Sequence, residues 1–432
     1  MLFDIRLGRA QALVIAASML SGGLALAAAG CTETDGRRRP DGSRPSGDVD
    51  SGGPIPGVDS GPRPVFDAGP PACHGGDDDD IDEDGFTPAQ GDCYDCSAQV
   101  NPAAFDDPSN TVDEDCDGTP ATMAEQCDTG LAIDSGDPQD AARAIGLCRF
   151  ITETETGWGV ISARYTRADG TAMPASPLQH GLLSSLGSVS SRVGNAMLSI
   201  SSGAARAPGQ AGYTTACDEY TTGPSGGPPA GLDPDSPACP GVVSGAVYDP
   251  VALEVRIRVP SNAEGFRFES NFFTYEYPNY ICSEYNDFFV VVMEPRPAGS
   301  SDGNIVFDVD GNKVSVNNSL LRACAPGTHG GRTFACPLGV GPLAATSFDD
   351  TAECGVEGIP GFPFPFPGSD AEVGASTGWL RTEAPVEGGS IITLRFAAWD
   401  AGDPTLDSLA LIDAFEWLLE DPGMVHTDPI LF

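Results

Sequence analysis

The sequence predicts a mainly β protein: an antiparallel β-sandwich of jelly-roll type, preceded by a small disulfide-rich, calcium-binding loop module and a disordered N-terminal linker. Three observations support this prediction. Several segments between 159 and 417 alternate apolar and polar residues with a period of two, which is typical of a strand with one buried face. Gly and Pro separate these segments, as in antiparallel sheets joined by turns. Before them, residues 73–127 concentrate Asp and Cys, and residues 31–72 have almost nothing to bury.

Residues 1–30 have the order of an export signal. Two arginines precede an apolar run at 10–26, and small residues then lead to Cys31. Small residues directly before a cysteine resemble a bacterial lipobox, which predicts that Cys31 is the lipidated first residue of an outer-membrane or cell-surface lipoprotein. Cleavage after Ala29 with plain secretion is the alternative, because Ala28 stands where a lipobox usually has Leu. An uncleaved anchor is disfavoured, since the run is short for a span of roughly 20 residues.

Residues 31–72 form the predicted linker. They are rich in Gly, Pro, Asp and Ser and contain loose repeats that begin at Val49, Val58 and Phe66. Such a composition is typical of flexible chain, because it offers little apolar surface to bury. A tether of this kind suits a domain that is held away from a membrane.

The charge and the cysteine content restrict the partners. The formal net charge is -40 and Lys313 is the only lysine, which argues against nucleic acid and anionic membrane surfaces and favours divalent cations. The expected partners are the membrane, through the lipid anchor, and a cell-surface glycan or protein ligand. Thirteen cysteines less Cys31 leave twelve, an even number that fits disulfides in an oxidising compartment. The disulfide candidates include Cys93, Cys116, Cys127, Cys148, Cys217, Cys239, Cys282, Cys324, Cys336 and Cys354.

Residues 73–127 carry the clearest metal-binding pattern. They include sixteen Asp or Glu and five Cys without a Lys or Arg, so a compact state needs disulfides and a counter-cation. The pattern DxDxDG occurs at 80–85 and again at 113–118. Alternate Asp side chains can turn toward one centre, and the Gly permits a sharp turn that brings a following carbonyl onto the ion. The predicted Ca²⁺ ligands are Asp80, Asp82, Asp84, the Phe86 carbonyl, Asp92, Asp113, Asp115 and Asp117.

Other arrangements fit this segment less well. A twelve-residue EF-hand loop would require Glu where the chain has Gly91, so the pattern predicts a Ca²⁺ loop outside the EF-hand frame. Cys93 and Cys96, with His74 and Cys116 nearby, leave zinc as an alternative, although disulfides are favoured in an exported chain. A solvated acidic linker is the alternative without a metal.

The order of motifs in this segment resembles a known repeat. DxDxDG is followed by GDCYD at 91–95, VNPAA at 100–104 and DEDCDG at 113–118. This run, over about residues 77–119, resembles the metal-binding repeat called MopE-like, which is found in bacterial surface proteins. The family's name is associated with copper, but the matched residues are oxygen donors, whereas copper prefers imidazole and sulfur.

Residues 128–432 are predicted to form the sandwich. The segments 252–259 and 265–270 alternate apolar and polar residues. Residues 408–417 are expected to form a strand, although the apolar spacing of 408–419 would also suit a helix. The other expected strands are 159–165, 197–201, 288–294, 304–309 and 390–400.

Two long loops, 202–249 and 325–375, interrupt the predicted sandwich. Unstructured loops of this length are unusual inside compact domains. Each carries two cysteines, so closeness in the sequence favours the bridges Cys217–Cys239 and Cys336–Cys354.

Motifs across residues 130–418 together resemble a second family. They are WGVISARYT at 158–166, QHGLL at 179–183, YNDFF at 285–289, NIVFD at 304–308, TGWLRTEAPV at 377–386 and WDAGDPTLDS at 399–408. Together these motifs resemble the choice-of-anchor L domain. The resemblance implies an exported β-sandwich at the cell surface, with varied anchoring and no catalytic activity.

A second candidate metal site lies in the predicted sandwich. Polar residues precede the strand at 288–294 and others follow the strand at 390–400, so loops at one end of a sandwich could bring them together as oxygen ligands. Turn formation alone would also explain Asp in such loops. The candidate ligands are Glu284, Asn286, Asp287, Asp400, Asp403 and Asp407.

No catalytic site is predicted. The histidines lie outside recognisable acid–base motifs, and the GxSxG match at 374–378 lacks the strand-to-helix turn of a nucleophile elbow. The sequence therefore favours an exported, cell-surface-anchored calcium-binding protein whose non-catalytic β-sandwich serves adhesion or ligand binding. A secreted hydrolase acting on surface polymers is the alternative.

Overall fold

The computed structural model describes residues 75–431 apart from three gaps, at 174–177, 217–225 and 350–373. The chain divides into Met1–Asp67 and Ala68–Phe432, and every described residue belongs to the second unit. The predicted export signal, the linker and Cys31 lie outside the described residues. In the part of the chain that is described, no helix is both long and apolar enough to cross a bilayer.

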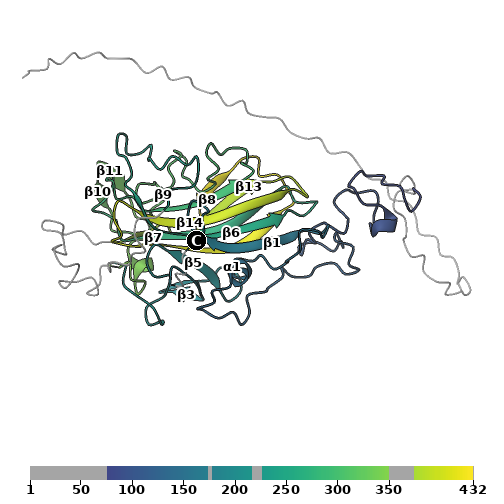
Figure 1. The fold of residues 1–432 in the computed structure, drawn as a ribbon, viewed down its shortest axis with the longest axis horizontal. Coiled ribbons are helices and arrows are strands. Elements are labelled where there is room, and N and C mark those ends of the chain that lie inside the picture. The colour runs from purple at the N-terminus through teal and green to yellow at the C-terminus, as the bar shows by residue number, and fades with distance from the viewer. Residues whose placement is uncertain (1–74, 174–177, 217–225, 350–373, 432) are drawn as a thin grey trace, which may run out of the picture. The chain divides into compact units, whose positions relative to one another are not determined.

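Two stacked antiparallel sheets form the body of the molecule (Figure 1). The first sheet has the order β1-β6-β14-β8-β9. Its strands are β1 (Gly159–Thr166), β6 (Val247–Arg258), β14 (Ile391–Ala401), β8 (Phe288–Glu294) and β9 (Val314–Ser315). Neighbouring strands are mostly far apart in the sequence, so the sheet forms only when the whole domain closes.

The second sheet has the order β16-β13-β7-β15-β5-β2, with the short β12 also paired to β7. Its strands are β16 (His426–Pro429), β13 (Leu380–Pro385), β7 (Gly265–Thr274), β15 (Ser408–Leu418), β5 (Met197–Ser201), β2 (His180–Leu183) and β12 (Ala375–Ser376). The two sheets confirm the predicted mainly β, antiparallel fold.

Side chains from the two sheets meet in one apolar core, because alternate residues of each strand face inward. Phe268 of β7 and Phe396 of β14 meet edge to face with ring centroids 5.3 Å apart, and both are fully buried. Leu394 and Phe266 belong to the same core cluster. Aromatic pairs of this geometry add about 0.5–1.5 kcal/mol to the gain from burial alone.

The predicted strands are found, with shifted ends, except for 304–309. Residues 304 and 307 make only isolated bridges, because the Asn304 side chain takes the place of ladder partners. Its Nδ2 donates to the Val306 carbonyl at 2.8 Å and its Oδ1 accepts from the Val291 N–H at 3.2 Å. An asparagine that bonds its own backbone competes with a sheet ladder in this way.

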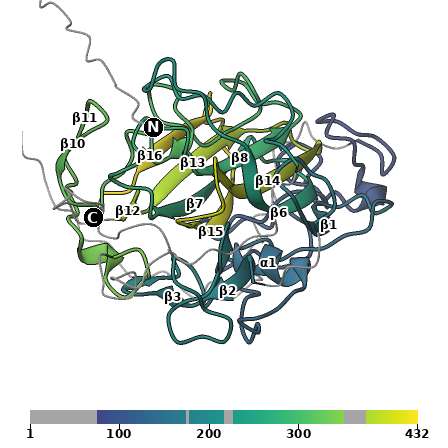
Figure 2. The same ribbon diagram turned by 60° about the vertical axis from the view of Figure 1, so that its left-hand side comes forward.

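The helix α1 (Pro138–Ala144) was not predicted, although the sequence contains its start signal. Asp137 is its N-cap and accepts a hydrogen bond from the Gln139 N–H, and Pro138 opens the helix. Three buried alanines face the core, and α1 lies beside β1 and β2 (Figure 2). The remaining short elements are η1 (Pro88–Gln90), β3 (Ser185–Leu186), β4 (Val189–Ser190), β10 (Gly327–His329), β11 (Arg332–Phe334) and η2 (Gly341–Leu343).

The predicted bridges of the two long loops are wrong. Cys239 pairs with Cys282, and Cys336 pairs with Cys324, each with Cα atoms 5.2 Å apart. The first bridge ties its loop to Cys282, beyond β7, whereas the second closes only the beginning of its loop, because Cys324 directly precedes residue 325. Cys217 and Cys354, the other predicted partners, lie outside the described residues.

Candidate metal site in the acidic module

The described part of the acidic module, residues 75–127, is built from turns that a disulfide holds together. Cys93 bonds to Cys116, with Cα atoms 5.7 Å apart, and so joins the two DxDxDG loops. Cys96 is also disulfide-bonded. Because these sulfurs are in disulfides, they cannot serve as thiolate ligands, and the zinc alternative is not supported. The bridge Cys127–Cys148 ties the end of the module to the segment after α1.

Backbone hydrogen bonds shape the first DxDxDG loop. The Gly85 N–H donates to Asp80 Oδ2 at 3.0 Å, and the Phe86 N–H donates to Asp84 Oδ1 at 2.8 Å. Gly85 has a φ of 93°, a conformation that residues with a Cβ rarely adopt. The glycine thus permits the sharp turn that the sequence pattern predicts.

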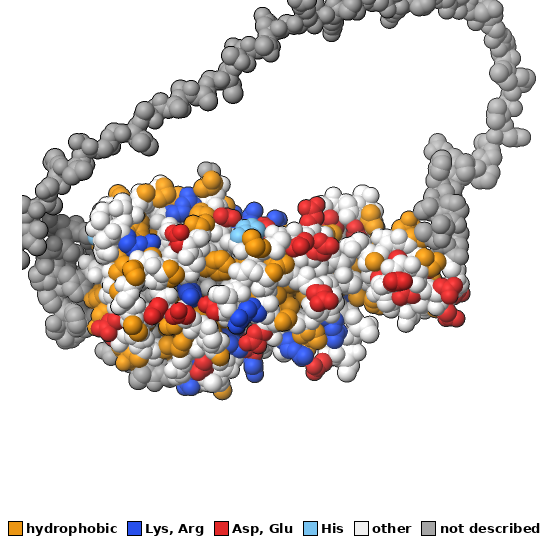
Figure 3. All heavy atoms as spheres, turned by 90° about the horizontal axis from the view of Figure 1, so that it is seen from above, with side chains coloured by type: hydrophobic (Ala, Val, Ile, Leu, Met, Phe, Trp, Pro, Cys, Tyr) orange, Lys and Arg blue, Asp and Glu red, His pale blue; other side chains and the backbone are white. Residues whose placement is uncertain are grey.

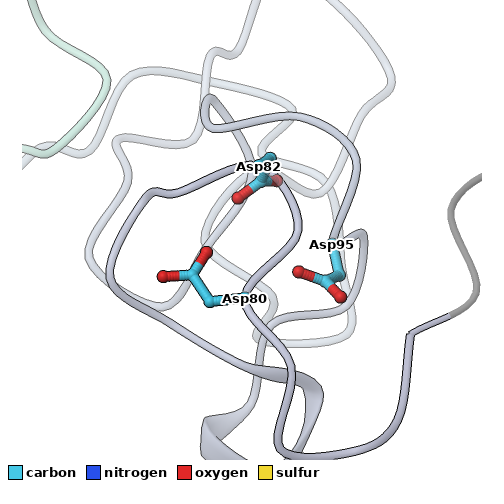
Figure 4. A group of neighbouring side chains, drawn as sticks. All are labelled: Asp80, Asp82 and Asp95. Atoms are coloured by element: carbon cyan, nitrogen blue, oxygen red, sulfur yellow. The ribbon is translucent and has the colours of Figure 1, made fainter.

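Two groups of carboxylates converge in this loop and share one residue. Asp80, Asp82 and Asp95 form the first group, in which one oxygen from each lies within 4.8 Å of the others (Figure 4). Asp82, Asp84 and Asp92 form the second. We call these five residues the paired site. Figure 4 shows the three side chains of the first group pointing toward a common space.

Each acid of the paired site has a buried oxygen without a hydrogen-bond partner among the described residues. These atoms are Asp80 Oδ1, Asp82 Oδ2, Asp84 Oδ2, Asp92 Oδ2 and Asp95 Oδ2. The other oxygen of Asp92 accepts from the Tyr94 N–H and that of Asp95 from the Ile81 N–H, both at 2.8 Å. One oxygen therefore fixes each side chain while the second faces the site. A buried polar atom without a partner costs about 1–3 kcal/mol.

The electrostatics of the paired site favour a cation. Burial raises the pKa of Asp84, and the neighbouring Asp82 and Asp80 raise it further. Burial also raises the pKa of Asp92, with added repulsion from Asp84 and Asp82. In the described chain no Lys or Arg forms an ion pair with any acid of the paired site. Figure 3 shows acidic side chains without basic ones at the module's end of the molecule, whereas acidic and basic side chains are mixed over the sandwich.

A third group of acids lies in the second DxDxDG loop. One oxygen from each of Asp106, Asp113 and Asp115 lies within 4.8 Å of the others. This group already has a basic neighbour, because Arg149 Nη1 is 3.7 Å from Asp115 Oδ2. Burial raises the pKa of Asp115, although Arg149 opposes that shift. A cation is therefore less needed here than at the paired site.

The acid groups in the structure differ from the predicted ligand set in three places. Asp95 and Asp106 belong to acid groups but were not predicted. Asp117 was predicted but lies outside the groups, with Oδ1 accepting from Thr119. Phe86, which was predicted to bind through its carbonyl, donates its N–H to Asp84. Asp95 follows Cys93 by two residues in GDCYD, which is the only local signal that could have identified it.

The module is attached directly to the sandwich. Asn262, in the turn between β6 and β7, accepts from the Phe105 N–H at 2.7 Å and donates to the Phe105 carbonyl at 2.9 Å. Trp158 donates its indole N–H to the Ala104 carbonyl at 2.7 Å and meets Phe105 edge to face. The VNPAA motif at 100–104 thus carries the module onto the sandwich, and Val100 and Ala104 are buried there.

The second predicted set of ligands is only partly brought together. Asn286, Asp287, Asp400 and Asp407 are buried at one end of the sandwich, and Asp403 is half-buried beside them. Glu284 is exposed, and its carbonyl accepts from the Gly245 N–H. Glu284 is therefore not placed as a side-chain ligand.

The serine of the GxSxG match is buried and hydrogen-bonded within the sandwich. Ser376 lies in β12, is fully buried and donates to Asn271 Oδ1 at 2.6 Å. It also accepts from the Gly378 N–H. This geometry differs from an exposed nucleophile on a strand-to-helix turn.

Comparison with known proteins gives no match: no family model, no curated protein and no solved structure is significantly similar to the chain. Its function must therefore be inferred from its own residues.

Proposed function

We propose that the protein is an exported, cell-surface-anchored calcium-binding protein, whose acidic module holds Ca²⁺ beside a non-catalytic sandwich that serves adhesion or ligand binding. The observation that carries the proposal is the paired site. Its five carboxylates each direct an oxygen without a donor toward shared space, and Asp82 belongs to both groups. Such an arrangement is costly without an ion and favourable with one.

Calcium fits this donor set better than other metals do. Ca²⁺ takes 6–8 oxygen ligands at about 2.3–2.6 Å in irregular geometry, so ligands on opposite sides of the ion are about 5 Å apart. Mg²⁺ needs near-octahedral geometry at shorter distances and keeps much of its water. Zinc and copper prefer nitrogen and sulfur, which the paired site lacks.

The placement at a cell surface is supported by the N-terminal sequence and by the disulfides. Small residues lead into Cys31 after an apolar run, as in a lipobox. The four described bridges fit an oxidising compartment outside the cytosol. A lipid on Cys31 would hold the module and the sandwich at the membrane through the linker.

The two family resemblances are part of the same proposal. The module carries the motifs of a MopE-like repeat over about residues 77–119, and residues 130–418 carry those of a choice-of-anchor L domain. Support for the first comes from the paired site, which supplies oxygen donors to a metal. Support for the second comes from the antiparallel sandwich.

Calorimetric titration of the exported chain with Ca²⁺ tests the metal proposal. We expect binding that weakens by about ten- to a hundredfold in Asp82→Asn, because that change removes a carboxylate from both groups and costs on the order of 1.4–2.8 kcal/mol. Asp78→Asn is the matched control, because Asp78 is exposed and outside the groups. Chelation should also increase protease cleavage within 75–127 while the sandwich stays folded.

Two outcomes would reject calcium binding by the module. One is a titration without heat or saturation in the wild type. The other is equal affinity in Asp82→Asn and Asp78→Asn, since an acidic surface that attracts ions by charge alone would lose the same from either change.

A further inference from the structure

One end of the sandwich buries a set of polar residues between its two sheets. Strands β5, β7 and β15 of one sheet and β6, β8 and β14 of the other begin or finish there. We call this set the end cluster, and each member is at most 2% exposed: Asp249, Glu276, Asn286, Asp287, Asp400 and Asp407.

The end cluster and the acidic module lie at opposite ends of the sandwich. The module is held by Ser261 and Asn262, between β6 and β7. Asp249 lies near the start of β6, and Glu276 follows the end of β7. Strands rise about 3.3 Å per residue, so ten-residue β7 separates the two regions by about 30 Å. One ion cannot serve both.

Among the described residues, the charged groups that shift the pKa of the central acids of the end cluster are other carboxylates. Burial raises the pKa of Asp400 well above its ordinary value, and Asp287 and Asp407 raise it further. The pKa of Glu276 is raised by burial first and then by Asp287 and Asp403. A buried charge needs a partner, because removing it from water costs several kcal/mol.

A buried acid elsewhere in the sandwich shows the usual solution. Glu254 is 8% exposed and receives two arginines, with Arg164 at 2.5 Å and Arg395 at 2.6 Å. Asp400 and Glu276 have no such ion pair among the described residues. The end cluster therefore departs from the way this same domain compensates buried charge.

Several polar atoms of the end cluster have no hydrogen-bond partner in the described chain. They are Glu276 Oε2 and the Oδ1 and Nδ2 of Asn286. The Asp400 carboxyl makes no close hydrogen bond, and its side-chain partners are the Ser202 hydroxyl and the Asp287 carboxyl. Asp287, in contrast, is fixed in place: its Oδ1 accepts from the Ala401 N–H at 3.2 Å and its Oδ2 from Ser408 Oγ at 2.8 Å. Buried polar atoms without partners, next to several buried acids and without an ion-paired base among the described residues, point to a missing positive ligand.

We propose that the end cluster binds a divalent cation, best matched by Ca²⁺, between the two sheets and independently of the module. Asp400 and Glu276 supply carboxylate oxygens, Asn286 supplies an amide oxygen, and Asp287 is held in position beside them. All of these donors are oxygens, which are the ligands that Ca²⁺ prefers.

The acids of the end cluster do not converge as closely as those of the module. Within the described residues, the groups of three acids whose oxygens lie within 4.8 Å of one another all belong to the module. A site in the end cluster therefore completes its coordination with the Asn286 amide, backbone carbonyls or water. Ca²⁺ accepts such mixed and irregular ligand sets.

Terbium luminescence tests the proposal in the full-length exported protein. Tyr285 packs against Gly402 and meets Tyr280 edge to face at 5.2 Å, and Glu276 and Asp403 raise the pKa of Tyr280 after burial does. These rings neighbour acids and loops of the end cluster, so we expect them to transfer excitation to Tb³⁺ bound there. The background protein is Asp82→Asn/Asp115→Asn, which removes a ligand from each acid group of the module.

In this background we expect Tb³⁺ emission that Ca²⁺ competes away, together with a rise in melting temperature on adding Ca²⁺. Adding Asp400→Asn should abolish both, and so should adding Glu276→Gln, which keeps the proposal testable if one variant does not fold. Glu254→Gln is the matched control: it loses ion pairs and stability, but it should keep both the emission and the shift caused by Ca²⁺.

Emission that is absent from the background protein, or that survives both Asp400→Asn and Glu276→Gln, would overturn the proposal. So would a melting temperature that Asp400→Asn raises equally with and without Ca²⁺, since that result assigns a bound proton to the acids. Loss of Ca²⁺ binding in the background protein, with normal binding by the wild type, would leave the module's function intact and reject only this second site.

Discussion

The imidazole of His180 lies flat on the ring of Tyr165, with centroids 3.6 Å apart and planes 14° from parallel. His180 belongs to β2 and Tyr165 to β1, which are edge strands of different sheets. The stack therefore joins the two sheets at one edge of the sandwich. Burial, with a contribution from the positive charge of Arg206, lowers the pKa of His180 to about 4.

The first prediction is a loss of stability in mild acid that depends on His180. The folded protein keeps His180 neutral down to about pH 4, whereas the unfolded chain takes up a proton below about pH 6.5. The stability that the protein gains from a neutral His180 is complete above pH 6.5 and is lost as the pH falls toward 4. His180→Phe keeps a stacking ring but cannot titrate, so the wild type should lose about 3 kcal/mol relative to it across this window.

Urea unfolding of both proteins at several pH values measures this difference. Comparison with the variant removes the effects of the buried carboxylates, which titrate in both proteins. Tyr165→Phe is the control, because it retains the ring and leaves His180 in place. Stability curves of wild type and His180→Phe that run parallel between pH 4 and 6.5 would show that His180 is not held neutral.

The second prediction concerns the attachment of the module. Asn262→Ala removes the hydrogen bonds to the Phe105 N–H and carbonyl and leaves both backbone groups without these partners. We expect destabilisation of about 2–4 kcal/mol, since an unsatisfied buried group costs about 1–3 kcal/mol. Hydrogen exchange should increase at 99–105 with little change in β14.

Ser261→Ala provides a graded comparison at the same place. It removes one side-chain bond, from Ser261 Oγ to Asn101 Oδ1, and leaves the bonds of Asn262 intact. Its effect should be near 1 kcal/mol. If Asn262→Ala and Ser261→Ala had equal effects on exchange, Asn262 would not be the principal attachment.

The sequence predicts strands well where one face of a strand is buried. Alternation along 252–259 and 265–270 leads directly to β6 and β7, because successive side chains in a strand point to opposite faces. It fails at 304–309, since the Asn304 side chain replaces the sheet partners of its neighbours. It also misses α1, which is short and whose buried residues are only alanines.

The residues of the candidate metal site also fall into two kinds: those that a continuous sequence pattern identifies and those that only the fold brings to the site. Asp80, Asp82 and Asp84 are recognised because DxDxDG is a continuous pattern. Asp95 lies outside this pattern, and the turn that follows the loop brings it beside Asp80 and Asp82, so its position in the sequence did not identify it. Cys239 likewise pairs with Cys282 and not with Cys217, which is closer in the sequence, because the fold decides which cysteines meet.

The third prediction concerns the anchor. If Cys31 carries a lipid, Cys31→Ser should move the protein from the membrane fraction to the soluble exported fraction and abolish labelling with a radioactive fatty acid. Because Cys31 belongs to the predicted linker and not to the sandwich, the change should leave the melting temperature of the sandwich unaltered. Fatty-acid labelling that persists in Cys31→Ser would rule out this cysteine as the anchor.

The fourth prediction separates the ligands that the structure assigns from those that the sequence pattern assigns. Asp95→Asn keeps an oxygen that can accept from the Ile81 N–H but removes the charge of Oδ2, which faces Asp80 and Asp82. Ca²⁺ affinity should fall by about tenfold or more, equivalent to about 1.4 kcal/mol. Asp117→Asn, at a position that DxDxDG would make a ligand, should leave the affinity nearly unchanged, because Asp117 is exposed and bonds to Thr119.

Calorimetric titration of both variants at the same ionic strength compares them directly, since each loses one negative charge and any effect of overall charge is equal. A larger loss of affinity in Asp117→Asn than in Asp95→Asn would mean that the continuous sequence pattern, and not the convergence of side chains in the fold, selects the residues that hold the ion.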